Sequence, residues 1–431
     1  MASVSTQFEP ASAKPADLNR YLLLVGAGFV ILGLLSPSKG VSLLPLQFLM
    51  KRELHFTPLD MARFFSIAGI AWYLKPVAAL ATDHFPIRGY RREPYMLMGA
   101  LSVAVLWIFI GFGPRTTWTL LGSVTLLTSM FVICQAPLSA LVVEGGRRFA
   151  ATGRLSTSRR VADYVALLLV GPMGGILARY PIAYCGSVCG VMSLLLAFTI
   201  ARFRPREPDR FVRESWVDLR RSIRQMLATR AMWMASLMFF LLTISPGFQT
   251  PFFFYRTDTL HFSPQYIGLL TLVSSAFSIV GSATYAWACR HKDLRFLLST
   301  AVVLDALAQG IFMFYNSPRS ALLIDAVAGL MRGFVWMPIL DLLVRAVPKG
   351  NEAIGAALEW SPANLSVALS DLLGSWLYQH HGFGFKSLAW MDGATTLLIL
   401  FVVPLIPKSV VAMREGQFAE TVTANDVALG A

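Results

Sequence analysis

Charged residues are scarce in this chain. Only 14% of its 431 residues are Asp, Glu, Lys or Arg, whereas an ordinary soluble domain carries about 25%. Hydrophobic residues make up 55% of the sequence, and apolar runs of about 20 residues, long enough to cross a bilayer as a helix, recur along it. The composition therefore excludes an ordinary soluble protein and indicates a membrane protein.

Residue types that build catalytic and metal sites are also few. The four cysteines form no Cys-x-x-Cys pair, and the six histidines are scattered without metal-ligand spacing. The sequence contains no Gly-x-Ser-x-Gly and no phosphate-binding Gly-x4-Gly-Lys-(Ser/Thr) motif. We therefore expect no enzyme activity and no cofactor, and any transport would be driven by a gradient or facilitated.

The apolar runs predict an all-α membrane protein with about twelve transmembrane helices, since they lack the period-two alternation of barrel strands. When the N-terminus is placed inside, most of the 37 Lys and Arg residues fall in inner loops and tails. This distribution predicts a multi-pass protein of the cell (inner) membrane with both termini cytoplasmic. The net charge of +13 then reflects topology and anionic lipid headgroups, and we expect no nucleic acid partner.

Two similar segments indicate an internal repeat. "ELHFTPLDMARFF" at Glu53 and "TLHFSPQYIGLLT" at Thr259 each follow an apolar run and open the next one. Two parallel six-helix halves explain this placement. We expect a tail over 1–19, halves over 20–200 and 231–407, a basic amphipathic linker on the membrane surface over 201–230, and a tail over 408–431.

A charged stretch, "ATDHFPIRGYRREPY", lies at 81–95 between the second and third predicted helices. An Asp at a helix end followed by Gly-Tyr-Arg-Arg resembles the cytoplasmic gating loop of the major facilitator superfamily. Asp83 would accept charge-assisted hydrogen bonds there and hold the inner side shut, with Arg91 and Arg92 beside it. We therefore predict a gating role for these three residues.

The longer string "IAWYLKPVAALATDHFPIRGYRREPYMLMGAL" resembles the folate-biopterin transporter family, which carries Trp-x2-Lys-Pro before the Asp and Pro-x2-Gly-Tyr-Arg-Arg after it. "LVVEGGRR" at Leu141 and "RAVPKGNEAIGAALEWSPANLS" at Arg345 are similar to further family segments. The resemblance implies the major facilitator fold and transport of a pterin or folate.

One departure from the family concerns the fourth helix. The family usually has an Asp-x3-Asp pair where this chain has Gln135 and Ser139. Gln135 still offers hydrogen bonds to the edge of a pterin, but without a charge. Because of this departure, the sequence itself predicts neither the family's usual substrate nor proton coupling by this pair of positions.

Ionisable residues within spans are the candidates for the site, because a charge in the membrane interior is costly unless it faces a cavity. Lys39 follows "SPS", a predicted break in the first helix, and Arg332 and Glu359 lie deep in their spans. Glu359 is the candidate for proton coupling, because burial disfavours a charged carboxyl group, and Arg332 is its counter-charge or that of the solute. Asp341 and Arg345, four residues apart, are expected to pair. The other in-span candidates are Asp163, Asp305, Asp325 and Asp371.

These patterns predict a monomeric secondary transporter that moves a small organic solute by alternating access, with Lys39, Gln135, Ser139, Arg332 and Asn364 contacting the solute. One alternative is a non-transporting sensor or assembly factor of the same fold. Another is a facilitator-type exporter of an unrelated solute. A central cavity lined by both halves would favour transport over the first alternative.

Overall fold

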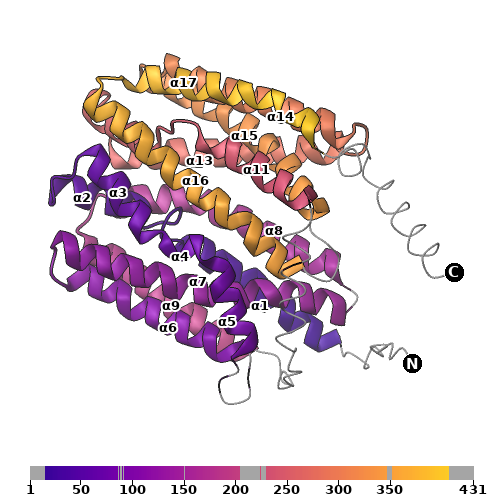
Figure 1. Ribbon diagram of the computed structural model, residues 1–431. Helices are drawn as coiled ribbons and strands as arrows, with labels where there is room; N and C mark the ends of the chain where they lie inside the picture. Colours follow the sequence, from indigo (N-terminus) through magenta and orange to yellow (C-terminus); the bar gives the residue numbers. More distant parts are fainter. Residues whose placement is uncertain are drawn as a thin grey trace.

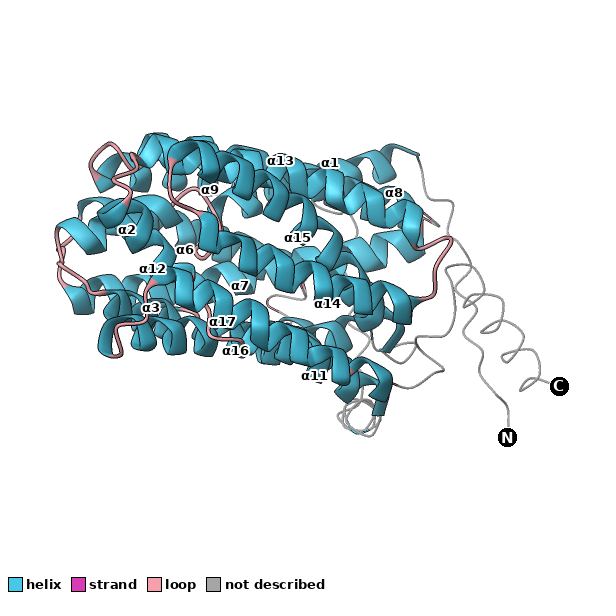
Figure 2. Cartoon of the chain, turned by 90° about the horizontal axis from the view of Figure 1, so that it is seen from above, coloured by secondary structure: helices cyan, strands magenta, loops and turns pink. Residues whose placement is uncertain are grey.

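The computed structural model describes residues 15–85, 87, 90, 92–149, 151–203, 224, 230–346 and 352–406. Within these ranges the chain forms long helices that run roughly parallel in one bundle (Figures 1 and 2). Most of the predicted linker, residues 1–14 of the predicted first tail and the whole of the predicted second tail lie outside the described residues.

The first half contains nine helical segments. They are α1 (Pro15–Leu35), α2 (Leu43–Arg52), α3 (Pro58–Ala68), α4 (Ile70–Tyr73), α5 (Lys75–His84), α6 (Glu93–Phe112), α7 (Thr117–Arg148), α8 (Thr152–Leu177) and α9 (Ile182–Phe203). The first membrane crossing is thus divided between α1 and α2, as predicted from "SPS". The second is divided among α3, α4 and α5.

The second half repeats this plan. Its segments are α11 (Arg230–Ile244), α12 (Gln249–Phe254), the π-helical turn η1 (Tyr255–Thr259), α13 (Pro264–Ala288), α14 (Leu294–Gly310), η2 (Ile311–Phe314), α15 (Pro318–Ala346), α16 (Glu352–His380), α17 (Phe385–Leu397), η3 (Leu398–Phe401) and η4 (Val403–Leu405). Ten helical stretches among the described residues are long and apolar enough to cross a membrane. With α16 and the divided run α3–α5, the total reaches the predicted twelve.

We call the end of the bundle that holds the start of α1 and the end of η4 the near end, and the opposite end the far end. At the near end η4 lies beside α14, and the Arg295 guanidinium donates to the Ile406 carbonyl over 3.3 Å. The far end holds the loops around residues 53–57, 113–116 and 260–263. Figure 1 shows the helices of the first half lying together, with α16 beside α3 and α4.

The two halves share a distinctive loop at the far end. His55 and His261 both have a φ angle of 52° and are the non-glycine residues with positive φ among those described. After each of them, a backbone N–H reaches back six residues, from Phe56 to Met50 over 3.0 Å and from Phe262 to Arg256 over 2.9 Å. The matching backbone conformation supports the internal repeat indicated by Leu-His-Phe-(Thr/Ser)-Pro.

The next helix starts in the same way in both halves. The Thr57 hydroxyl accepts from the Asp60 N–H, and the Ser263 hydroxyl accepts from the Tyr266 N–H, each over 3.2 Å. A proline follows each cap at the first helical position, where its missing N–H costs nothing. Thr57 or Ser263 followed by Pro therefore fixes where the second crossing of each half begins.

Glycines allow several helices to approach closely. A Cβ on Gly333 would lie 2.0 Å from the Ser278 carbonyl oxygen, and one on Gly281 would lie 1.9 Å from that of Leu330, so α13 and α15 touch through backbone. Between the halves, a Cβ on Gly171 would lie 2.5 Å from the Gly268 carbonyl oxygen. The small residues of the segment "GPMGGILA", which begins at Gly171, therefore allow close packing between α8 and α13.

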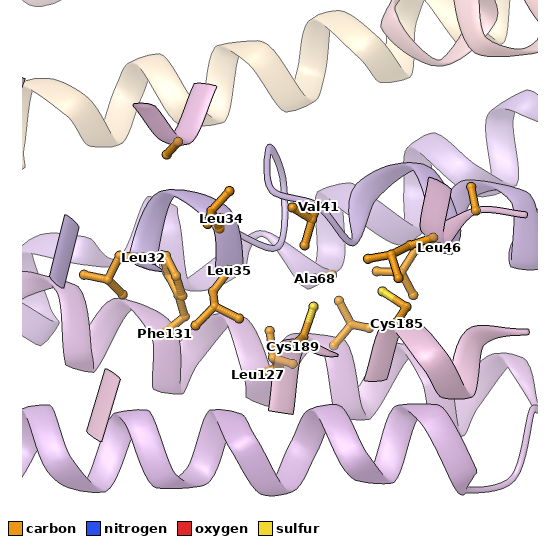
Figure 3. Close-up of a cluster of buried hydrophobic side chains, with 14 of the residues drawn as sticks. Leu32, Leu34, Leu35, Val41, Leu46, Ala68, Leu127, Phe131, Cys185 and Cys189 are labelled. Carbon is orange, nitrogen blue, oxygen red and sulfur yellow. The ribbon is translucent and has the colours of Figure 1, made fainter. Parts of the chain in front are cut away.

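The buried core of the first half surrounds the break between α1 and α2. Figure 3 shows Leu34, Leu35 and Val41 near this break, with Cys185 and Cys189 among the neighbouring apolar side chains. All four cysteines are buried, and none of them forms a disulfide. Their apolar surroundings make them small packing residues.

We predict that Gly333→Ala lowers the free energy of unfolding by about 1–3 kcal/mol, because its Cβ would overlap the α13 backbone. The thermal unfolding midpoint of the purified protein in detergent measures this effect. Gly122→Ala in α7 is the matched control, since a Cβ there meets no atom within 4 Å. A midpoint for Gly333→Ala equal to that of the control would show that the α13–α15 contact is looser than described.

Candidate functional site

A cavity of about 180 Å³ lies between the two halves. The first half contributes residues from the α1–α2 break, α2 and α8, and the second half contributes residues from α12, η1 and α13. The lining residues are Lys39, Gly40, Leu43, Leu44, Gln47, Val170, Gly171, Gly174, Gln249, Phe252, Phe253, Arg256, Ile267, Gly268 and Thr271. A cavity lined by both halves favours transport over the alternative of a non-transporting sensor or assembly factor.

Lys39 lies in the α1–α2 break and lines this cavity. Its side chain is exposed although apolar core residues such as Leu35 and Val41 surround the break. Its ammonium group makes no hydrogen bond or ion pair with another described residue. The cation therefore faces the cavity without a counter-ion from the described part of the protein, an arrangement suited to binding an anionic group.

Arg256 in η1 is the second cation of the cavity wall, but it is already paired. Its guanidinium donates to both carboxylate oxygens of Asp325 on α15, over 3.0 and 3.2 Å, and lies 3.5 Å from the Phe252 ring centroid. The Tyr315 hydroxyl donates to the same carboxylate over 2.7 Å. This buried network holds Arg256 against α15 and leaves one face of its side chain in the cavity.

Helix α12, which follows the break after α11, contributes Gln249, Phe252 and Phe253 to the cavity wall. The Asp371 carboxylate on α16 accepts from the Thr250 N–H over 2.8 Å and from the Thr250 hydroxyl over 2.6 Å, at the first turn of α12. The Gly247 N–H donates to the Ser370 carbonyl over 3.0 Å. Asp371 therefore satisfies the start of α12, and through it places Gln249 at the cavity.

Contacts between the halves close the far end above the cavity. The Lys51 ammonium on α2 bonds Thr257 and Asp258 in η1. The rings of Phe48 and Phe253 meet edge to face with centroids 5.2 Å apart. The Leu59 N–H donates to the Gln379 side chain over 3.3 Å. Together with the glycine contact of α8 and α13, these interactions separate the cavity from the far end.

Of the five predicted solute contacts, Lys39 lies at this cavity and the other four do not line it. Gln135 and Ser139 lie one turn apart on α7, where the Gln135 side chain accepts from the Lys75 ammonium over 3.4 Å. Asn364 is half-buried on α16, and Arg332 lies on α15 with its guanidinium 5.0 Å from the Phe312 ring centroid. Their contact with a solute stays a prediction.

Most of the residues predicted for gating and coupling lie wholly or partly outside the described part of the chain. Arg91 lies outside the described residues, and the side chains of Asp83 and Glu359 do too, although their backbones belong to α5 and α16. Arg92 immediately precedes α6 and is half-buried.

The predicted pairing of Asp341 with Arg345 is confirmed. The Arg345 guanidinium donates to both carboxylate oxygens, over 2.9 and 2.8 Å. The Tyr285 hydroxyl on α13 adds a third hydrogen bond to Asp341 over 3.0 Å. This carboxylate is therefore fully engaged in holding α13 and α15 together.

Sequence reasoning missed Arg256, Gln47, Gln249 and Asp392. Arg256 stands near the end of its apolar run and looked like a loop residue. Asp392 is one acid in the last run, "SLAWMDGATTLL", and this isolation was the signal that could have found it. The two glutamines carry no charge and gave no signal above the surrounding sequence.

Solved structures with the same fold are secondary transporters. A D-xylose–proton symporter aligns with a TM-score of 0.68 at 14% identity, over 90% of this chain and 98% of the other. A POT peptide transporter also aligns with a TM-score of 0.68, at 13% identity, over 93% of this chain and 96% of the other. These matches confirm the predicted fold of two six-helix repeats.

Relatives by sequence carry transporter names. The Folate-biopterin transporter of Synechocystis sp. is 26% identical over 397 residues, covering 85% of this chain and 78% of its own length. Folate transporter 1 of Plasmodium falciparum is 24% identical over 381 residues, covering 83% of this chain and 74% of its own. The chain is thus a multi-pass membrane transporter of a small solute and not an enzyme.

The resemblance seen in the residues around Asp83 is confirmed over nearly the whole length of the protein. The sequence model of one family matches residues 38–415, from the first helix break to beyond the last described helix. The chain belongs to the BT1 family.

Proposed function

We propose that the chain is a secondary transporter of an anionic, folate-like or pterin-like solute, which binds in the cavity between the halves. The observation that carries this proposal is Lys39, an exposed cation in the cavity that pairs with no other described residue. A carboxylate of the solute would supply the missing counter-charge. The names of the relatives provide the solute class.

The remaining wall suits such a solute. Phe253 offers an aromatic ring to a flat solute, whereas the faces of Phe252 are covered by Arg256 and Phe385. The amides of Gln47 and Gln249 offer donors and acceptors for the polar edge of the solute. Arg256 is paired with Asp325. Of the two cations that line the cavity, Lys39 is therefore the one available to pair with the solute. An exporter of an unrelated anion would meet the same wall, and the choice of solutes in the assay separates the two.

The far-end contacts support a further part of the proposal, the sidedness of the site. We take the far end as the outer face, because the basic loops and tails of the sequence belong inside. The structure then corresponds to a state in which the outer route is closed. The linker over 201–230 would contact anionic headgroups on the inner face, and the protein would act as a monomer in the cell (inner) membrane.

Uptake into liposomes tests the proposed function. Purified protein should accumulate radiolabelled folic acid or biopterin above protein-free liposomes, and unlabelled folate should compete while D-xylose should not. Uptake of D-xylose without uptake of either named probe would overturn the assigned solute class.

We predict that Lys39→Gln weakens binding of folic acid roughly 10- to 100-fold, because a hydrogen bond to a charged group contributes about 1.5–3 kcal/mol. Titration of the purified protein with folic acid measures the change. Lys386→Gln, which removes an exposed lysine at the far end, is the control and should bind as the unaltered protein does. Equal affinity of the two variants would remove Lys39 from the site.

The proposed gating role of the Asp83 loop concerns the rate of transport and not the affinity for the solute. Asp83→Asn should slow exchange of solute roughly tenfold or more, because the charge-assisted hydrogen bonds of the latch are lost, while affinity stays nearly unchanged. Arg91→Ala should act in the same direction, and Arg92 belongs to the same loop. Exchange rates in liposomes and binding titrations measure the two effects, with Arg154→Ala, an exposed arginine on α8, as control. An affinity loss as large as the rate loss would place the loop at the solute.

The coupling proposal concerns Glu359. Glu359→Gln should abolish accumulation driven by a pH gradient yet allow exchange of solute down its own gradient, because the amide cannot carry a proton. Counterflow and pH-driven uptake, measured in the same liposomes, distinguish these outcomes. Accumulation that persists in the variant would assign Glu359 to helix packing.

A further inference from the structure

Three ionisable residues meet inside the second half, away from the cavity wall. Asp305 on α14 and Asp392 on α17 are 9% and 8% exposed. Arg332 on α15 lies within electrostatic range of both carboxylates. We call these three residues the α14–α15–α17 cluster. All three belong to helices long and apolar enough to cross the membrane.

Backbone contacts bring the two helices that carry the carboxylates close together. A Cβ on Gly393 would lie 2.8 Å from the Ala306 carbonyl oxygen and 3.3 Å from the Gly310 nitrogen, so α17 and α14 touch one residue beyond each aspartate. Arg332 approaches from the third helix, over the Phe312 ring just past the end of α14. The cluster therefore follows from close helix packing.

The cluster has more negative than positive charge when every group is ionised. Among the described residues, the other charged groups in range of Arg332 are Asp325 and Arg256, and they neutralise each other in a pair at 3.0 Å. Within this described set Arg332 faces two carboxylates, so a net charge of −1 remains. An uncompensated charge away from water is costly, and the usual relief is to bind a proton.

The carboxylates differ in their partners. The Ser245 and Thr396 hydroxyls lie beside Asp392. Asp305 accepts no hydrogen bond and forms no ion pair within the described part of the chain. A carboxylate that is nine-tenths buried and has no hydrogen-bond partner is costly in its charged form, so binding of a proton is favoured there.

The cluster connects to the cavity by two short routes. Ser245 lies in the α11–α12 break, where its carbonyl accepts from the Ser370 hydroxyl over 2.5 Å, and α12 continues from there into the cavity wall. The second route runs from Arg332 through the Asp325–Arg256 pair, since Arg256 lines the cavity. A change of charge in the cluster therefore acts on both the position of α12 and the field at the cavity.

We propose that the α14–α15–α17 cluster is a proton-binding site, in which one exchangeable proton binds to either Asp305 or Asp392 in the field of Arg332. Protonation converts one carboxylate to a carboxylic acid and brings the net charge of the cluster from −1 to zero. The proposal deepens the proposed transport function and rests on it, because release and uptake of this proton accompany the movement of α12 during the cycle. It concerns a carboxyl site separate from Glu359.

Infrared difference spectroscopy tests the site without any solute. Between acidic and alkaline buffer, the protein in lipid should lose the C=O stretching band of one protonated carboxylic acid. Asp305→Asn and Asp392→Asn should each lose this titrating band, because the remaining carboxylate is then neutralised by Arg332. Arg332→Gln should instead double the band, because both carboxyl groups then bind a proton.

Asp293→Asn removes a carboxylate just before α14, at its near end, and should leave the band unchanged. Equal bands in all variants would overturn the proposal. Elution as a single species in size-exclusion chromatography shows that a variant is folded. Since two aspartate variants and the arginine variant give opposite changes, misfolding of one leaves the test intact.

A transport arm separates this proposal from the proposed function. With folic acid as probe, Asp305→Asn and Asp392→Asn should reduce accumulation driven by a pH gradient at least tenfold and retain exchange. If folic acid is not transported, the infrared result still decides whether the cluster binds a proton. If the band is present and accumulation is unaffected in both variants, the proton is bound but takes no part in the cycle, and the proposal fails.

Discussion

The structure depends on satisfying backbone groups where the first and seventh membrane-crossing helices are interrupted. Hydrocarbon offers no hydrogen-bond partners, so a break is tolerated only where the protein supplies them. In the first half, the Gly40 N–H donates to the Ser36 carbonyl over 2.7 Å, and the Val41 N–H donates to the Leu34 carbonyl over 2.9 Å. In the second half, the partners are Ser370 and Asp371 on another helix. These interactions keep the breaks in place.

The cavity is a consequence of these breaks. A continuous helix would bury its backbone groups and present side chains alone, whereas the interrupted first crossing turns Lys39 towards the second half. The interrupted seventh crossing places Gln249 and the Phe252 and Phe253 rings opposite. Because each half supplies one break, a solute bound between them contacts both halves at once, as alternating access requires.

Much of the fold was predictable, because hydrophobic length and loop motifs are local properties. The break after Leu35 was foreseen from Ser-Pro-Ser, and the repeat was foreseen from the segments that contain His55 and His261. The pairs that shape the cavity were not, because Arg256 and Asp325 are far apart in sequence and meet only after α15 packs on η1. Asp305 and Asp392 come together for the same reason, through glycine-mediated packing that composition does not reveal.

The far-end contacts have a consequence for how the protein responds to its medium. Helices α8 and α13 meet through Gly171 and Gly268, and the polar bonds that join the halves at this end among the described residues are those of Lys51 and Gln379. Asp258, the partner of Lys51, has a side chain that is 57% exposed. Dissolved ions weaken an exposed ion pair of this kind. In the proposed transport cycle, the salinity of the compartment facing this end would therefore influence how readily the closed state opens.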